Sequence, residues 1–187
     1  PIFIIKNICI NSKSIKKNDA FFAIKGKRLD GNRYVSEAIK RKSSLIIANK
    51  INKNYPTLKQ VKVKNSLRFL TNCSSIFREN INAKIISITG SCGKTTLKDM
   101  IGSILKKISS TTYSPKSFNN KYGVPLSLFN LKQKDIFGVC EVGMDKKGEI
   151  NQLTKILKPD LGIITNISYA HSKNFNNIYQ IAAAKAR

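Results

Sequence analysis

The chain of 187 residues has 34 lysines and arginines against 10 aspartates and glutamates, which gives a formal net charge of +24 at pH 7. Its apolar content of 41% is sufficient for a hydrophobic core, which excludes a wholly disordered chain, and its length fits one ordinary domain or two small ones. No apolar run is long enough to cross a membrane, we expect no signal peptide, and the four scattered cysteines (Cys9, Cys73, Cys92, Cys140) fit a reducing cytosol.

The high positive charge has two interpretations. One is a polyanionic partner such as nucleic acid. The other is compositional drift, because Lys, Asn and Ile are abundant along the whole chain. The lysines are dispersed and do not form one basic run with interleaved aromatic residues. We therefore favour drift, with some attraction of an anionic substrate and nucleotide, over nucleic-acid binding.

The first part of the chain predicts a small mixed α/β unit. Short apolar runs predict strands at residues 2–5, 8–10, 20–24, 45–48 and 61–63. A short helix is predicted at 34–41, after the turn signal Asp30-Gly31. Ser66 is predicted to cap a second helix that runs to about Phe77. Residues 78–83 are expected to connect this unit to the next.

From Lys84 onward, strands and helices alternate. Strands are predicted at 85–89, 110–113, 136–142 and 161–166, and helices at 94–107, about 124–131, 148–157 and 177–187. This alternation predicts a parallel sheet with helices on both of its faces. The helix at 94–107 is expected to bury one apolar face, made of Leu97, Met100, Ile101, Ile104 and Leu105.

A glycine loop joins the strand at 85–89 to this helix. Its residues are Gly90, Ser91, Cys92, Gly93, Lys94, Thr95 and Thr96. Glycines allow a tight turn and a close ligand, and free amides at a helix N-terminus favour a phosphate. The usual phosphate-loop pattern has a further glycine, at the position where this chain has Ile88. A plain strand-to-helix turn is the alternative, but we favour a shortened phosphate loop in which Lys94 neutralises phosphate and Thr95 binds Mg²⁺.

Two polar residues stand out from otherwise apolar segments. Glu141 ends an apolar strand, where a carboxylate is costly unless it is paired or binds a metal, and we favour the metal role over simple solvation. Lys185 shares a helix face with Ile178 and Ile181. It is either a side chain that reaches solvent near the helix end or a functional lysine in a perturbed environment.

The remaining candidates lie in loops after predicted strands. His171, the single histidine, follows the strand at 161–166 and is either structural or functional. Asn119 and Asn120 lie in a loop before a helix that is expected to start with a proline, and they are either ligand-binding or turn residues.

Taken together, these segments resemble the Mur ligases, ATP-dependent amide-bond-forming enzymes of peptidoglycan synthesis. The resemblance rests on Ile88-Thr-Gly-Ser-Cys-Gly-Lys-Thr-Thr-Leu-Lys-Asp-Met100, Ser117-Phe-Asn-Asn-Lys-Tyr-Gly-Val-Pro-Leu126, Glu141-Val-Gly-Met144, Ala170-His171 and Ile181-Ala-Ala-Ala-Lys185. In the first unit it rests on Asn11-Ser12-Lys13 and on Phe21 to Gly31. It spans nearly the whole chain and implies a UDP-sugar-binding N-terminal domain at 1–82 and the first part of a phosphate-loop ATPase domain at 83–187.

The resemblance also implies the chemistry. The segments are most similar to the member of this family that adds a dipeptide, which implies a ligase that would join D-alanyl-D-alanine to UDP-N-acetylmuramoyl-tripeptide through an acyl phosphate, with ATP and Mg²⁺. Lys94, His171 and Lys185 would be catalytic, and Gly90 to Thr96 would hold ATP. Thr95, Glu141, His171 and Lys185 would serve the metal ions, with Lys185 carbamylated. The substrate-binding set would be Ser12, Lys13, Asp30, Gly31, Asn119 and Asn120.

For the whole protein we expect a cytoplasmic monomer without membrane contact. Two alternatives stay open. One is a sister ligase that adds a diamino acid, and the other is a basic fragment that binds nucleotide or nucleic acid without turnover.

Overall fold

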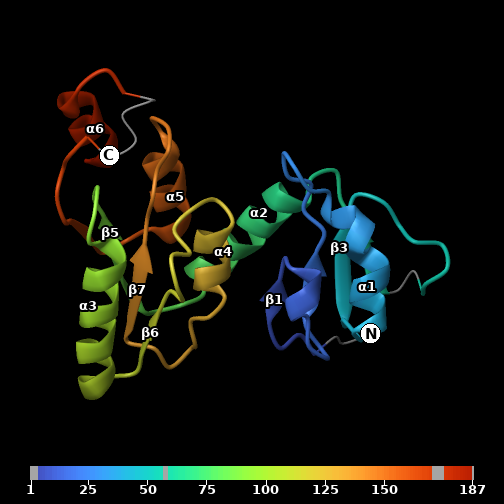
Figure 1. Cartoon of the computed structure of the whole chain (residues 1–187). Helices are drawn as coiled ribbons and strands as arrows, with labels where there is room; N and C mark the ends of the chain where they lie inside the picture. Colours follow the sequence, from blue (N-terminus) through green and yellow to red (C-terminus); the bar gives the residue numbers. More distant parts are fainter. Residues whose placement is uncertain (1–3, 57–58, 170–174, 187) are drawn as a thin grey trace. The chain divides into compact units, whose positions relative to one another are not determined.

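Apolar runs separated by turn residues build two parallel sheets in this computed structural model, which describes residues 4–56, 59–169 and 175–186. The chain divides into two compact units, Pro1–Cys73 and Ser74–Arg187, and the boundary falls inside helix α2 (Ser66–Glu79). The predicted α/β fold class is confirmed, because each unit has its own four-stranded parallel sheet (Figure 1). The functional assignments of residues 1–82 and 83–187 stay predictions.

The first unit orders its strands β1-β2-β3-β4, and all three pairings are parallel. The strands are β1 (Ile8–Cys9), β2 (Ala20–Phe22), β3 (Leu45–Ala48) and β4 (Gln60–Lys62), joined by the 3-10 helices η1 (Ser12–Ser14) and η2 (Gly31–Tyr34) and by α1 (Val35–Lys40). Its core consists of apolar side chains from β2, β3, α1 and their flanks: Ile15, Phe21, Ala23, Val35, Ala38, Ile46 and Ala48.

Two predictions for this unit were wrong. In the predicted strand 2–5, Ile4 and Ile5 lie outside any strand, and residues 2 and 3 lie outside the described part of the chain. The cap of α2 is Asn65, whose Oδ1 accepts a hydrogen bond from Arg68 N at 2.9 Å, whereas Ser66 is the first helical residue. Asn and Ser are both good caps, so the sequence pattern alone did not distinguish them.

The second unit follows the predicted alternation of strands and helices. Its strands are β5 (Lys84–Thr89), β6 (Thr111–Tyr113), β7 (Phe137–Glu141) and β8 (Leu161–Ile164), in the order β6-β7-β5-β8 and all parallel. Its helices are α3 (Lys94–Ile108), α4 (Gly123–Leu128), α5 (Glu149–Leu157) and α6 (Ile178–Lys185). Among the described residues, no helix combines the length and the apolar character needed to span a membrane.

Helices cover both faces of this sheet, with α3 on one face and α4 and α5 on the other (Figure 1). Successive side chains of a strand point to opposite faces of the sheet, so those at the end of β7 point in turn towards α3 and towards α4 and α5. Cys140 and Val142 join the large core under α4 and α5, whereas Glu141 faces α3 and bonds to Thr95. The same core takes Ile181 and Ala184 from α6.

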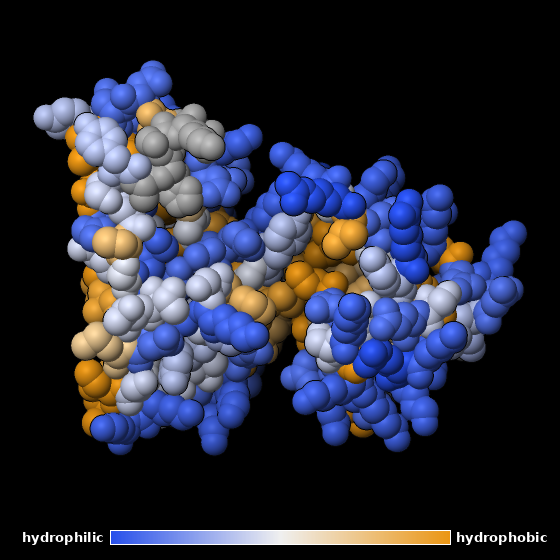
Figure 2. Space-filling model, viewed as in Figure 1, coloured by the Kyte–Doolittle hydropathy of each residue, from blue (hydrophilic) through white to orange (hydrophobic). Residues whose placement is uncertain are grey.

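The predicted buried face of α3 was partly wrong, because Leu97, Ile101 and Leu105 are half-buried but Met100 and Ile104 are exposed. Met100 and Ile104 are 57% and 59% exposed, and Figure 2 shows a hydrophobic band along the α3 side of this unit. Lys98 and Gly102 are the buried residues of α3. A Cβ on Gly102 would lie 2.5 Å from the Tyr113 ring, so a glycine is needed for α3 to approach β6 this closely.

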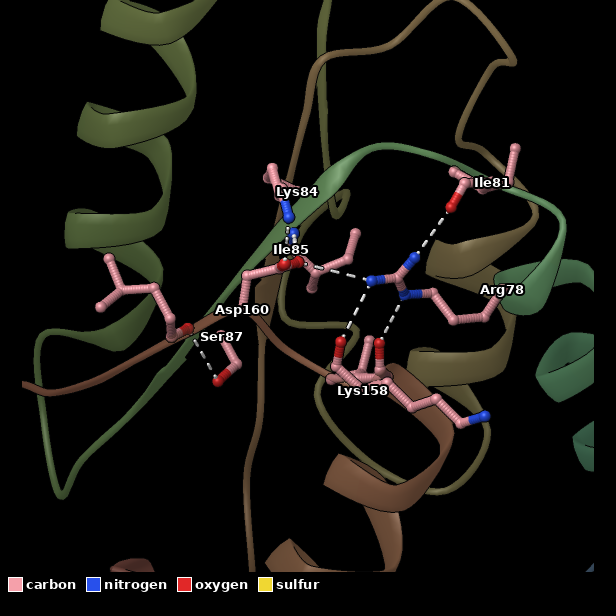
Figure 3. Close-up of polar contacts among 9 residues, drawn as sticks. Arg78, Ile81, Lys84, Ile85, Ser87, Lys158 and Asp160 are labelled. Carbon is pink, nitrogen blue, oxygen red and sulfur yellow. Dashed lines mark hydrogen bonds and ion pairs between the residues drawn. The ribbon is translucent and has the colours of Figure 1, made fainter.

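Arg78, Lys84 and Asp160 form a charged cluster at the start of β5 (Figure 3). The guanidinium of Arg78 donates to the carbonyl oxygens of Leu157 at 2.7 Å, Ile81 at 2.9 Å and Lys158 at 3.1 Å. Asp160 accepts from Ile85 N at 2.8 Å and pairs with Lys84 at 2.9 Å and with Arg78 at 3.5 Å. The cluster thus joins the end of α2 and the end of α5 to the start of β5.

Asp160 makes the stability of this unit depend on pH. The hydrogen bond from Ile85 N, and next the one from Lys84, hold the pKa of Asp160 below its ordinary value of 3.8. A carboxyl whose pKa is lowered by folding stabilises the protein above 3.8 and loses that contribution as the pH falls through its folded pKa. We expect Asp160→Asn to lower the free energy of unfolding at pH 7 by about 1.5–3 kcal/mol, the range for hydrogen bonds to charged groups. Urea unfolding followed by circular dichroism measures this.

Glu79→Gln is the matched control for Asp160→Asn. Glu79 pairs with Lys158 at 2.7 Å, but both side chains are more than half exposed, so its loss should change stability by less than about 1 kcal/mol. The difference between the parent and Asp160→Asn should shrink below pH 3.8. A difference that stays constant down to the acid limit would contradict the assignment of the ionised carboxylate.

Candidate functional site

The loops that follow β5, β6, β7 and β8 meet at one edge of the second sheet, because all four strands are parallel. The loop after β5 holds residues 90–93, and β7 ends at Glu141. The segment after β6 leads to Asn119, and the segment after β8 begins with Thr165 and Asn166. These segments form the candidate site.

The turn after β5 needs its two glycines for different reasons. Gly90 has φ +149°, and a Cβ there would lie 1.8 Å from Thr165 Oγ1, so both the backbone and the space exclude a side chain. Gly93 has φ +76°, but its Cβ would meet nothing within 4 Å. At Gly93 the left-handed backbone alone favours glycine.

Helix α3 starts directly after Gly93 and has no side-chain cap among the described residues. The amides of its first turn and its positive dipole end are therefore suited to an anion. Lys94 Nζ folds back over the loop and donates to Gly90 O at 2.8 Å and Ser91 O at 3.4 Å. The structure thus brings the predicted lysine, glycines and helix start together in one cradle.

The segment after β8 clamps this loop. Asn166 Oδ1 accepts from the amides of Ser91 at 3.1 Å and Cys92 at 3.0 Å, and Thr165 Oγ1 donates to Cys92 O at 2.6 Å. Ser168 N donates to Ser91 Oγ at 2.9 Å. The two strands β5 and β8 are neighbours in the sheet, so this clamp follows directly from the topology.

Glu141 is held against the start of α3. It is 1% exposed, its Oε2 accepts from Thr95 Oγ1 at 2.7 Å, and its Oε1 accepts from Asn119 Nδ2 at 2.7 Å. Within the described part of the chain, none of the ion pairs involves Glu141. A buried carboxylate that receives only neutral donors is costly, so this oxygen-rich corner is suited to a divalent cation.

Lys185 is buried at 5% exposure in the last turn of α6. Burial of the amine, and next the positive charge of Lys94, lower the pKa of Lys185 from 10.5 to about 8. Lys185 therefore points inward in a perturbed environment, and its predicted catalytic and metal role stays a prediction. His171, the other residue predicted beside it, lies outside the described residues.

Two further polar side chains at this edge differ in their hydrogen bonding. Asn120 Oδ1 accepts from the amides of Tyr122 and Gly123 at 3.0 Å each, so its carboxamide oxygen supports the turn into α4. Thr89 Oγ1, just before Gly90, is a buried hydroxyl for which the described residues supply no hydrogen-bond partner. An unpaired buried hydroxyl at the base of the loop is consistent with a bound polar ligand or water there.

The first unit has a cavity of its own, of about 430 Å³, at the carboxyl ends of β2, β3 and β4. Its lining is rich in lysine and amide side chains and consists of Lys25, Asp30, Asn32, Asn49, Lys50, Lys64, Asn65 and Ser66. The predicted Asp30 is among these residues. It also caps η2 through Asn32 N, and Gly31 follows it in a position where a Cβ would lie 2.6 Å from Ile24 N.

Ser12 and Lys13 are not in the lining of this cavity. Ser12 is buried, and its Oγ donates to Glu37 Oε2 at 2.6 Å, which lowers the pKa of Glu37. Lys13 is exposed. Sequence reasoning did not single out Lys25, Asn49, Lys50 and Lys64, although the rule that ligands gather where parallel strands end would have found them.

Comparisons with known proteins agree with this architecture. Residues 88–187 match the family model of the Mur ligase middle domain, and residues 4–78 match that of the Mur ligase family, catalytic domain. The UDP-N-acetylmuramoyl-tripeptide--D-alanyl-D-alanine ligase of Buchnera aphidicola subsp. Acyrthosiphon pisum is 36% identical over 183 residues, which is 98% of this chain and 40% of that protein.

Solved structures agree as well. MurF from Acinetobacter baumannii has a TM-score of 0.88 at 33% identity, over 97% of this chain and 40% of that one. MurF from Thermotoga maritima in complex with ADP has a TM-score of 0.84 at 31% identity, over 98% of this chain and 42% of that one. The chain therefore spans about 40% of the length of the relatives it matches. Because the middle-domain model alone matches more than half of its residues, the chain belongs to the Mur ligase family.

Proposed function

We propose that the second unit binds ATP and that a protein of the relatives' full length uses it to form an amide bond. The observation that carries this proposal is the 2.7 Å contact between Thr95 on the glycine cradle and the buried carboxylate of Glu141. Phosphoryl transfer needs a triphosphate and a divalent cation held side by side, and this contact supplies oxygen ligands next to a phosphate cradle. The Thermotoga relative was solved in complex with ADP, which supports nucleotide binding by a protein of this family.

The residues at this corner fit Mg²⁺. Thr95 Oγ1 and Glu141 Oε2 are hard oxygen donors, and no lysine or arginine among the described residues pairs with Glu141. Bound there, Mg²⁺ would neutralise charge on the phosphates. Asn119 orients the carboxylate by donating to its other oxygen, and Lys94 is placed to donate to β- and γ-phosphate oxygens.

Lys185 and His171 are proposed to serve a second metal position. An ammonium cannot ligate Mg²⁺, but an amine with a pKa of about 8 is partly neutral near pH 7 and can react with CO₂. The resulting carbamate is an oxygen donor. Its negative charge would also be stabilised by Lys94, the cation that lowers the pKa of the free amine.

The first unit is proposed to bind the anionic sugar nucleotide. Three lysines, Lys25, Lys50 and Lys64, line its cavity together with amide side chains. The positive charge of the lysines suits a diphosphate. Each side-chain amide has a donor and an acceptor, which can pair with the acceptor and donor of a uracil ring. The predicted Asp30 lines this cavity. Ser12, Lys13 and Gly31 do not line it, and their substrate role stays a prediction.

The proposed reaction has two steps. The terminal carboxylate of UDP-N-acetylmuramoyl-tripeptide attacks the γ-phosphorus of ATP, which gives an acyl phosphate and ADP. The amine of D-alanyl-D-alanine then attacks the acyl carbon, loses a proton and expels inorganic phosphate. This substrate pair follows the name of the Buchnera relative, and a cytoplasmic location and a monomeric state stay predictions.

Nucleotide binding by this chain tests the cradle. We expect Lys94→Met to weaken ATP binding roughly 10- to 100-fold, because it removes charge-assisted hydrogen bonds worth about 1.5–3 kcal/mol. Isothermal titration calorimetry measures the affinity. Lys106→Met is the matched control, since Lys106 is exposed in the last turn of the same helix and its loss changes the charge of +24 equally. Equal binding by both variants would favour a non-catalytic basic fragment that attracts anions generally.

Ligation tests the substrate assignment. In a protein that carries this chain within the relatives' full length, we expect UDP-N-acetylmuramoyl-tripeptide and D-alanyl-D-alanine to release phosphate and form the amide. Glu141→Gln should reduce the rate at least about 100-fold, because the amide keeps the shape and removes the charge. Coupled phosphate release and mass spectrometry of the product measure this. Turnover with UDP-N-acetylmuramoyl-dipeptide and a diamino acid instead would support the sister ligase.

Carbamate formation tests Lys185. In ¹³C-bicarbonate at pH 8 about half of this amine is neutral, given its pKa of about 8, whereas the charged form dominates at pH 6. An ordinary lysine is neutral in roughly under 1% of molecules at pH 8. We therefore expect a ¹³C carbamate resonance at pH 8 that weakens at pH 6 and is missing in Lys185→Arg. A resonance of equal size in Lys185→Arg would assign it to another amine.

A further inference from the structure

The most unusual side chain outside the proposed machinery is Lys98. It lies on the inner face of α3 and is 0% exposed. Lysines are almost never fully buried unless they are paired, so the partners of this ammonium show what its burial achieves.

The ammonium of Lys98 bonds to a backbone carbonyl and to one carboxylate. Lys98 Nζ donates to Lys116 O at 2.6 Å and pairs with Asp99 Oδ1 at 3.1 Å, although the Asp99 side chain is 53% exposed. Lys116 has φ +49°, a left-handed conformation that a residue with a Cβ adopts only when its surroundings hold it there. The bond from Lys98 is therefore made at the strained point of the loop after β6.

The residues that follow Lys116 reach the candidate metal corner. Ser117 Oγ lies 3.4 Å from Thr95 Oγ1, and Asn119 Nδ2 donates to Glu141 Oε1 at 2.7 Å. The carbonyl of Asn119 also accepts from Gly143 N at 2.7 Å, which joins the loop to the segment after β7. Lys98 and Thr95 lie one turn apart on α3, so a single helix holds both ends of this chain of contacts.

We propose that Lys98 is a positioning residue: its buried ammonium fixes the Lys116 carbonyl and thereby places Asn119 on Glu141. Lys98 acts through the loop, because its ammonium already bonds to Lys116 O and pairs with Asp99. The effect on the loop follows from the contacts of Lys98, Lys116 and Asn119, whereas the effect on Mg²⁺ rests on the proposed function.

A purely structural lysine would behave differently. If Lys98 only filled space between α3 and the sheet, its replacement would lower the stability of the whole unit and leave the loop no more mobile than the rest. Methionine has a similar length and an apolar head, so Lys98→Met removes the donor with little change in packing. Asp135→Asn is the matched control for lost stability, because Asp135 is buried and bonds to Ser110 Oγ at 2.8 Å beside the opposite end of β7.

Hydrogen exchange of the chain without added ligand tests the loop. In Lys98→Met we expect the Gly143 amide to exchange about tenfold faster or more, relative to amides in the middle of β5, because its acceptor Asn119 O is released. Asp135→Asn should leave this ratio unchanged. An unchanged ratio in Lys98→Met overturns the proposal. If Lys98→Met does not fold, Lys98→Gln is measured in the same way, since its shorter amide keeps a polar head but cannot reach Lys116 O.

Nucleotide binding then tests the consequence for the metal. The affinity for ATP is measured with Mg²⁺ and with EDTA. We expect Lys98→Met to change the affinity in EDTA by less than about twofold and to reduce the gain from Mg²⁺ about tenfold. An equal loss in both conditions, or no loss in either, overturns the metal effect. If the parent itself does not bind ATP, the proposed function fails, and hydrogen exchange still decides the role of Lys98.

Discussion

A buried carboxylate is the constraint around which the second unit is arranged. Glu141 lies at the end of β7, and its two oxygens are bonded to Thr95 on α3 and to Asn119 on the loop after β6. Three separate chain segments must therefore be in register before this charge is even partly satisfied. The parallel sheet provides that register, because its strands end at the same edge. The acid is buried, despite the energetic cost, where the proposed cation and phosphate chain would meet.

Much of this unit could be predicted from the sequence because its signals are local. The β-branched run before Gly90 and the regular alternation that follows it gave the strands and helices to within a few residues. Glu141 and Lys185 were found because a charge inside an apolar pattern is unusual, and both are buried. The predicted roles of His171, Asn120 and the substrate residues needed distances between segments, which spacing along a chain does not supply.

The errors have physical reasons. Hydrophobic periodicity treats each residue as wholly apolar or wholly polar, but Lys98 buries its carbon stem and satisfies its head group on Lys116 O, so the inward face of α3 was misjudged. Gly102 adds to this, because the contact with Tyr113 needs the absence of a side chain and leaves no apolar residue to detect. In the first unit, strands of two to four residues are too short for a period to be read. Its lysine-lined cavity was missed because its lining comes from the ends of several strands.

The fold-back of Lys94 has an energetic consequence for the resting protein. Its ammonium already bonds to the carbonyls of Gly90 and Ser91, so a phosphate that bound to Lys94 would have to replace these two acceptors. The net gain of binding is then the difference between two sets of hydrogen bonds, and it is smaller than the new contacts alone would give. In return the backbone of Gly90 and Ser91 is held in a single shape by Lys94, which would reduce the entropy lost if a ligand bound there.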